Sequence, residues 1–221
     1  MAVVPKLPVP CLALITDRRL CRGLPLEEAV AEAVGGGVDV VQLREKDLPA
    51  NELLRLAKKV RAAIQGQALF VVNDSLDVAL ACGADGVHLP ERGLPVAAAR
   101  RLAGGHFIIG RSVHSLEEAR RAQDEGADYV QVGAIFASRS HPDAPPAGLR
   151  LLEEVAEAVS IPILAVGGIT ADNAGQAVRA GASGAAVISA ILGAPSPGKA
   201  ARRLAEAMAE AAAASARRTR P

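Results

Sequence analysis

The clearest candidate for chemistry in this chain is His114, which ends a short polar segment after an apolar run. The apolar residues from Phe107 onward predict a buried strand. Ser115 and Glu118 form a capping box, so a helix is expected to begin directly after His114. In parallel α/β proteins, ligands bind where the strands end. An imidazole there can accept and return a proton near neutral pH, so we expect His114 to be a catalytic acid or base.

A second polar group follows another apolar run and comprises Gln42, Arg44 and Lys46. Strand alternation places these three side chains on one face. Three donors at one strand end, two of them cationic, suit an oxyanion such as a phosphate or a carboxylate. The alternative is a solvated cluster in which Arg44 or Lys46 pairs with Glu45 or Asp47. The position at a strand end favours a binding role.

Polar residues also stand at the ends of the next two apolar runs. Asn73 is suited to hydrogen-bonding a heterocycle. Asp74 is suited either to holding Mg²⁺ or to capping the next helix. His88 lies close to the same edge, either as a reacting group or as a hydrogen-bonded support for one. His106 precedes a strand, at the opposite edge, and we give it no role.

Three later loops offer polar or flexible groups. A long Pro-rich loop that contains Ser138 and Ser140 runs to Gly148 and is a candidate lid, which would supply hydroxyls when closed. Glycines in the loop after the seventh apolar run and a serine after the eighth predict a phosphate site, because backbone N–H groups can approach a ligand there. The alternative for these loops is a pair of tight strand–helix turns. The predicted phosphate-binding residues are Gly167, Gly168, Ile188 and Ser189.

Several common catalytic patterns are missing from the sequence. It contains no HExxH, GxSxG or P-loop motif. This excludes the zinc-protease, serine-hydrolase and P-loop classes.

The elements that must position these residues alternate regularly along the chain. Amphipathic stretches with helical spacing separate the apolar runs, which favours parallel βαβ units. The apolar runs are continuous, as expected for strands covered on both faces. The predicted strands are Leu12–Thr16, Val38–Leu43, Leu69–Val72, Gly86–Leu89, Phe107–Gly110, Tyr129–Gly133, Pro162–Val166 and Ala185–Ile188.

A weak internal repeat supports an eightfold arrangement. Four segments begin with glycine, close a helix and lead into the second, fourth, sixth and eighth strands; they start at Gly37, Gly83, Gly126 and Gly181. We therefore predict a single (β/α)₈ TIM barrel over residues 1–221, with a frayed C-terminal tail after about residue 212. A doubly wound open sheet is the competing architecture.

Composition limits the partners of this barrel. A formal net charge of +1 provides no field for nucleic acid or an anionic membrane, and no apolar run is long enough to span a bilayer. Three cysteines without a CxxC pair argue against disulfides and a zinc ribbon, which indicates a cytoplasmic protein. We expect a small-molecule ligand, no nucleic acid and no membrane. The sequence leaves the oligomeric state open, a homo-oligomer included.

With these residues described, the whole chain resembles the superfamily of thiamine phosphate synthases and TenI-type thiazole tautomerases. The matching motifs follow one another in the family order. They are Gln42-Leu-Arg44-Glu-Lys46, Val72-Asn73-Asp74, Asp85-Gly-Val-His88-Leu, Gly110-Arg-Ser112-Val-His114-Ser115, Val132-Gly-Ala-Ile-Phe136, Ala165-Val-Gly167-Gly168-Ile-Thr170 and Val187-Ile188-Ser189.

The synthase branch joins a hydroxymethylpyrimidine diphosphate to a thiazole phosphate. Resemblance to it implies that Gln42, Arg44, Lys46 and Asn73 contact the pyrimidine diphosphate, whereas Gly168, Ile188 and Ser189 hold the thiazole phosphate. It also implies Mg²⁺ on two aspartates. Asp74 matches the first, but Gly93 stands at the second, and the Ser138 to His141 loop lacks the synthase lysine.

The tautomerase branch requires neither metal nor diphosphate, so the sequence favours a thiazole tautomerase without a cofactor. His114 would then move the proton that aromatises a thiazole carboxylate phosphate, while Arg44 or Lys46 holds the carboxylate. Ser112, Ser138 and Ser140 complete the predicted substrate contacts. The synthase is the second hypothesis. A catalytically inactive, ligand-binding regulatory barrel is the third.

Overall fold

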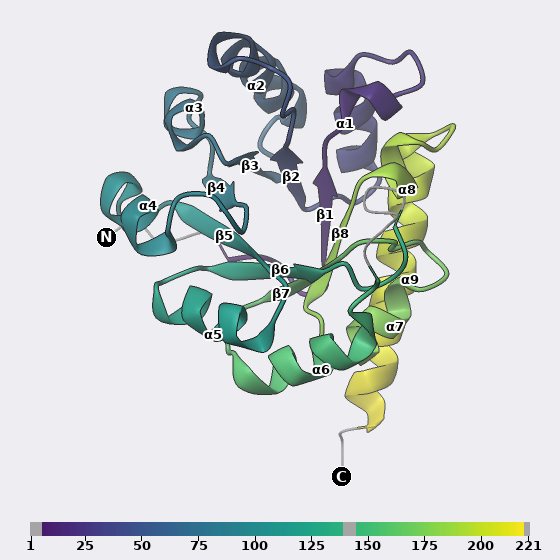
Figure 1. Ribbon diagram of the computed structural model, residues 1–221. Coiled ribbons are helices and arrows are strands. Elements are labelled where there is room, and N and C mark those ends of the chain that lie inside the picture. Colours follow the sequence, from purple (N-terminus) through teal and green to yellow (C-terminus); the bar gives the residue numbers. More distant parts are fainter. Residues whose placement is uncertain (1–5, 139–144, 219–221) are drawn as a thin grey trace.

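Eight parallel strands close into a barrel in the computed structural model, which describes residues 6–138 and 145–218 (Figure 1). Each strand pairs with the next, and β8 pairs with β1. This closure confirms the predicted (β/α)₈ barrel and excludes the open sheet. The strands are β1 Cys11–Ile15, β2 Val40–Leu43, β3 Leu69–Asn73, β4 Gly86–Leu89, β5 Ile108–Val113, β6 Tyr129–Gly133, β7 Ile163–Val166 and β8 Gly184–Val187.

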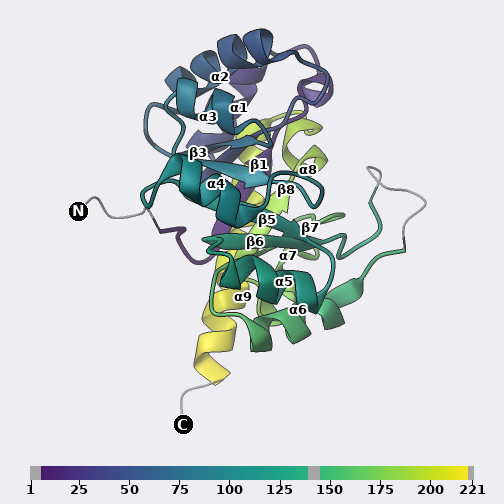
Figure 2. The same ribbon diagram turned by 60° about the vertical axis from the view of Figure 1, so that its left-hand side comes forward.

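Helices follow the strands and surround the barrel (Figure 2). They are η1 Arg18–Leu20, α1 Leu26–Gly35, α2 Ala50–Ile64, α3 Leu76–Ala81, α4 Val96–Ala103, α5 Leu116–Asp124, α6 Gly148–Ala158, α7 Ala174–Arg179, α8 Ser189–Leu192 and α9 Pro197–Arg218. Among the described residues, none of these helices is long and apolar enough to cross a membrane.

The last helix closes the ring of helices. Helix α9 packs against both α7 and α1, and Figure 1 shows it running beside α7. The end of α1 approaches the start of α9 so closely that a Cβ on Gly36 would lie 2.2 Å from the carbonyl oxygen of Gly198. Only glycine therefore fits at position 36, because a side chain there would collide with the backbone of Gly198.

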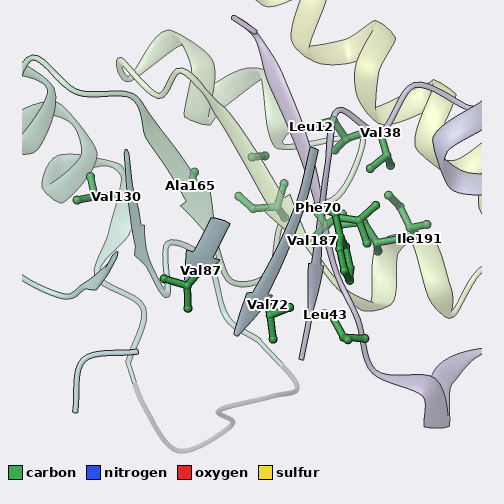
Figure 3. Packing of buried hydrophobic residues seen from close by; sticks show 14 of the residues in the cluster. Leu12, Val38, Leu43, Phe70, Val72, Val87, Val130, Ala165, Val187 and Ile191 are labelled. Atoms are coloured by element: carbon green, nitrogen blue, oxygen red, sulfur yellow. The ribbon is translucent and has the colours of Figure 1, made fainter. Parts of the chain in front are cut away.

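The hydrophobic core has two shells, because successive strand residues point to opposite faces. The outer shell lies between strands and helices and includes Leu12, Val72, Val87 and Ile191 (Figure 3). The inner shell fills the barrel itself. Its buried members are Leu7, Cys11, Ala13, Ile15, Val40, Val71, Ile108, Tyr129, Leu164 and Ala186. Cys11, Cys21 and Cys82 are buried free thiols, as expected.

The four glycine-led segments form a true repeat at the edge where the strands begin, which we call the N-terminal rim. Gly37, Gly83, Gly126 and Gly181 all have positive φ. The residue two positions after each glycine accepts a hydrogen bond from the backbone of the preceding strand. The four bonds are Leu12 N to Asp39 Oδ2 (2.8 Å), Phe70 N to Asp85 Oδ2 (2.8 Å), Ile109 N to Asp128 Oδ2 (2.7 Å) and Ile163 N to Ser183 Oγ (3.2 Å). Each of these side chains adds a bond between two neighbouring strands, and each glycine has the left-handed conformation that the repeat predicts.

Strand β5 differs from its prediction because it continues to Val113, three residues beyond the expected end at Gly110. Ser112 therefore lies within the strand and not after it. The polar residue is accommodated because its side chain meets other polar groups inside the barrel, described below. His114 still follows the strand directly, and Ser115 caps α5 by accepting a hydrogen bond from Glu118 N at 3.2 Å.

Candidate active site

A cavity of about 970 Å³ opens where the strands end, and we call it the C-terminal cavity. It contains most of the residues that the sequence singled out. Among the described residues, its walls include Gln42, Arg44, Lys46, Asn73, Ser112, His114, Ser138, Gly167, Gly168, Ile188 and Ser189. Ser140, the remaining predicted substrate contact, lies outside the described residues. A second cavity, of about 380 Å³, lies at the N-terminal rim, far from these groups.

Three amide side chains form a hydrogen-bonded chain at the floor of the C-terminal cavity, which we call the amide chain. Gln131 Nε2 donates to Gln42 Oε1 at 2.6 Å, and Gln42 Nε2 donates to Asn73 Oδ1 at 3.0 Å. Gln42 is 2% exposed and Gln131 is 4% exposed. Because Asn73 Oδ1 is occupied as an acceptor, its Nδ2 remains as a donor at the cavity wall.

A second chain of polar groups lies beside the first and involves Tyr129, His88 and Ser112. His88 Nδ1 lies 3.1 Å from Tyr129 Oη, and His88 Nε2 lies 2.8 Å from Ser112 Oγ. Burial, and then the charges of Arg111 and Arg44, lower the pKa of His88 to about 3. His88 is therefore neutral at physiological pH, and it holds the Ser112 hydroxyl at the cavity instead of reacting itself. This is the supporting role that the sequence offered as one of two for His88.

Two positive side chains face the same cavity from the end of β2. Arg44 and Lys46 both line it, and neither forms an ion pair with a described residue. The neighbouring Glu45 is instead buried and accepts hydrogen bonds from Thr16 Oγ1 at 2.7 Å and from Arg18 Nη1 at 2.8 Å. The local charge pairing offered as the alternative for this segment is therefore wrong. Uncompensated cations at a cavity wall suit an anionic ligand.

Asp47 belongs to the same Arg18 network but lies in solvent. It accepts two hydrogen bonds from the Arg18 guanidinium, at 2.8 and 2.7 Å. The bonds from Arg18 lower the pKa of Asp47 to about 2. Arg18 thus draws both carboxylates away from the cavity.

His114 stands at the cavity wall with a defined ring orientation. Its Nδ1 lies 2.5 Å from the carbonyl oxygen of Gly133, so Nδ1 carries a proton. Its Nε2 faces Glu91, with 3.8 Å between Nε2 and Oε2. Both side chains are about half exposed, at 52% and 50%. The loop that carries Glu91 is fixed by Arg111, which donates to the carbonyl oxygens of Glu91 and Leu94.

Another wall of the cavity is made by the loops after β7 and β8. Gly167 and Gly168 have φ values of 92° and 65°. A Cβ on Gly168 would lie 2.4 Å from the carbonyl oxygen of Ala137, so this loop packs tightly on the loop after β6. Ser189 is the first residue of α8, where backbone N–H groups have no partner inside the helix. The predicted phosphate-binding residues therefore share one wall of the cavity.

Asp74 directly follows β3 and is exposed, with a φ of 66°. It does not cap α3, whose N-cap is Ser75, so the capping role is wrong. A Cβ on Gly93 would lie 2.9 Å from Asp74 Oδ1, which puts position 93 directly against this carboxylate. Among the described residues no group of three or more His, Cys, Asp or Glu could hold a metal. A single carboxylate is still compatible with Mg²⁺, which is commonly held by one or two carboxylates together with substrate phosphates.

Gln131 and Glu91 are two polar cavity residues to which the sequence assigned no role. Gln131 lies in the middle of an apolar strand, and its partner Gln42 is 89 residues away. The only signal was a polar residue in the run Tyr129–Gly133.

Comparison with known proteins gives consistent matches. A family described as thiamine monophosphate synthase matches residues 12–191. The chain is 48% identical to the thiamine-phosphate synthase of Methanoculleus marisnigri over 90% of this chain and 96% of that protein. It is 50% identical to the thiamine-phosphate synthase of Anaeromyxobacter dehalogenans over 81% of both. The solved thiamine phosphate pyrophosphorylase of Pyrococcus furiosus is 42% identical, with a TM-score of 0.84, over 91% of this chain and 96% of that one.

These matches overturn the tautomerase hypothesis and, with it, the isomerase class. Relatives that are 42–50% identical over most of the chain carry synthase or pyrophosphorylase names. The tautomerase prediction rested on two local differences, at Gly93 and in the loop after Ser138. Those differences weigh less than the whole-chain similarity, because Mg²⁺ does not require a second protein carboxylate.

Proposed function

The chain belongs to the thiamine monophosphate synthase family, and on this premise we propose that it joins a hydroxymethylpyrimidine diphosphate to a thiazole phosphate and releases pyrophosphate. One observation carries the proposal beyond similarity. Two cations that have no carboxylate partner among the described residues line a cavity of about 970 Å³, whose walls also include a glycine-rich loop. A cavity with two anion-binding walls suits two phosphorylated substrates.

The pyrimidine diphosphate binds on the side formed by β2 and β3. Asn73 and Gln42 provide amide groups for the ring, and Arg44 and Lys46 contact the diphosphate. Arg44 is half-buried, which strengthens its interaction with an anion relative to a fully solvated charge. Ser112, held by His88, adds a hydroxyl next to the ring site.

The thiazole phosphate binds on the side formed by the loops after β7 and β8. The backbone N–H groups of Gly168 and Ser189 bind the phosphate, because glycine-rich loops and helix N-termini are common phosphate sites. Gly167 and Ile188 shape the same wall, and the Ser138 hydroxyl lies at its edge. The two substrates therefore meet over the floor of the barrel.

In the reaction, the bond between the pyrimidine methylene and the diphosphate breaks, and a bond to the thiazole forms. Negative charge accumulates on the leaving diphosphate, and the fixed charges of Arg44 and Lys46 stabilise it. Asp74 is the residue that would hold Mg²⁺, which neutralises phosphate charge when bound. No proton has to move between carbon atoms, so His114 serves as a substrate contact whose ring is oriented by Gly133.

The cellular setting forms part of the same proposal. Phosphorylated substrates are too polar to enter a lipid bilayer at low cost, so an enzyme that uses them is expected in the cytoplasm. A homo-oligomer remains a prediction from the sequence.

The test is a direct assay of the purified protein with both substrates and Mg²⁺. We expect pyrophosphate release that depends on each substrate and stops when a chelator removes the metal. Thiamine phosphate should form in equal amount. Absence of pyrophosphate release under these conditions would refute the proposal.

A further inference from the structure

Gln131 is a buried amide that reaches across the barrel to the pyrimidine side of the cavity. It lies on β6, whereas its partner Gln42 lies on β2. The two side chains meet at 2.6 Å, and both are almost completely buried. Gln131 also lines the cavity, so it is close enough to influence a bound ligand.

The amide chain has a direction, because each bond fixes which end of the next amide carries oxygen. Gln131 supplies a donor, so the oxygen of Gln42 points towards β6 and its nitrogen towards β3. The Gln42 nitrogen in turn donates a hydrogen bond to the oxygen of Asn73. The Asn73 N–H groups are then left for the ligand, and among the described residues Nδ2 donates to no protein acceptor.

We propose that Gln131 is a positioning residue that, through Gln42, makes Asn73 present an N–H to a ring nitrogen of the pyrimidine substrate. This inference rests on the proposed function and deepens it. A pyrimidine ring nitrogen is an acceptor, so it requires a donor at this point of the wall. Gln131 itself does not need to touch the substrate.

Loss of Gln131 would remove the hydrogen bond that fixes the direction of the amide chain. Gln42 Oε1 would become a buried acceptor without a donor. The Gln42 amide could then turn over, since its oxygen and nitrogen occupy similar volumes, and Asn73 would face the ligand with its oxygen. An oxygen opposite a ring nitrogen is repulsive.

The first experiment measures steady-state kinetics of Gln131→Met, which keeps the volume and removes the hydrogen bond. We expect KM for the pyrimidine diphosphate to rise about tenfold or more, while KM for the thiazole phosphate stays within about twofold. Gln123→Met is the matched control, because among the described residues the Gln123 side chain hydrogen-bonds only Ser160, on the outside of the barrel. Equal changes in both KM values, or no change in either, would overturn the proposal.

A double-variant cycle tests whether Gln131 acts through Gln42. If it does, Gln42→Met with Gln131→Met should match Gln42→Met alone within about twofold. Multiplicative effects of the two substitutions would show independent roles and overturn the mechanism.

A third measurement needs no variant and also separates this inference from the proposed function. In ¹⁵N-labelled wild-type protein, the Asn73 side-chain amide signal should shift when the pyrimidine diphosphate is added and not when the thiazole phosphate is added. If the wild-type protein binds the pyrimidine diphosphate without turning it over, the synthase proposal fails while this inference stands. An unshifted Asn73 signal in the pyrimidine complex would overturn the inference, whatever the turnover.

Discussion

The two rims of the barrel use similar polar side chains for different purposes. At the N-terminal rim, Asp39, Asp85 and Asp128 each accept a backbone N–H from the preceding strand. At the opposite rim, Asn73 and Arg44 keep donors directed at a cavity. In this fold, the end of the strand at which a polar residue lies indicates its role better than its residue type does. Polar groups at the start of a strand stabilise the structure, and those at its end face the cavity.

The largest expected effect concerns the functional rim. Arg44→Met should lower kcat/KM for the pyrimidine diphosphate by about 10²–10³-fold, because a charge directed at the leaving diphosphate is lost. The thermal midpoint should change little, since among the described residues Arg44 bonds the protein through its backbone N–H, at Thr16 Oγ1, and not through its guanidinium. Activity assays with a parallel melting curve check this. A large drop in the midpoint would place Arg44 among the structural groups and break the comparison.

The corresponding change at the structural rim is Asp128→Ala. Asp128 Oδ2 accepts from Ile109 N at 2.7 Å and from Arg100 Nη2 at 2.6 Å. We expect a loss of about 2–3 kcal/mol in the free energy of unfolding, since two donors lose a charged acceptor. Denaturant unfolding measures it, and Asp128→Asn, which keeps an acceptor for Ile109, is the control. Both KM values should remain those of the wild-type protein; a changed KM would contradict the assignment.

A third prediction concerns His88, which lies below the functional rim. Its pKa falls from 6.5 in the unfolded chain to about 3 in the folded protein. Below about pH 6.5 the unfolded state binds a proton that the folded state does not, so stability decreases as pH falls from 6.5 towards 3. The slope is about 1.4 kcal/mol per pH unit. Between pH 4 and 5.5, the unfolding free energy of the wild-type protein should fall more steeply with decreasing pH than that of His88→Gln, by about 1.4 kcal/mol per pH unit.

The smallest effect is expected at Asp47, on the exterior of the same rim. Its bonds to Arg18 lie in solvent, where ion pairs contribute little. Asp47→Asn should leave the melting midpoint and both KM values nearly unchanged. Glu45→Gln, at the buried end of the same Arg18, should lower the midpoint clearly. Equal effects of the two substitutions on the midpoint would show that burial does not determine how much each carboxylate contributes to stability.

The barrel could be predicted from sequence because its signals are local. Each Gly-x-Asp or Gly-x-Ser segment ends a helix and begins a strand within a few residues, as Gly126 and Asp128 illustrate. The end of β5 was missed because Arg111 and Ser112 are polar, and only the surrounding barrel shows that Ser112 faces other polar groups.

The site was predicted less completely, because its missing parts depend on long-range contacts. The alternative for Arg44 and Lys46 paired them with Glu45 or Asp47, yet Arg18 binds Glu45 from 27 residues away. The hydrogen bond between Gln131 and Gln42 could not be predicted, because only the closed barrel brings these two distant residues together. The choice between synthase and tautomerase failed for a related reason, since it weighed two positions against similarity that extends over the whole chain.

The contact between α1 and α9 also affects how this protein folds during its synthesis. Helix α1 is synthesised well before α9, the helix that covers part of it. Strand β1 likewise waits for β8 as its second neighbour. At about 5–20 residues per second, synthesis of the residues that separate α1 from α9 takes about 10–30 seconds. Nascent chains of this protein therefore carry an uncovered apolar face on α1 until α9 has been made, which makes that face a natural target for chaperones.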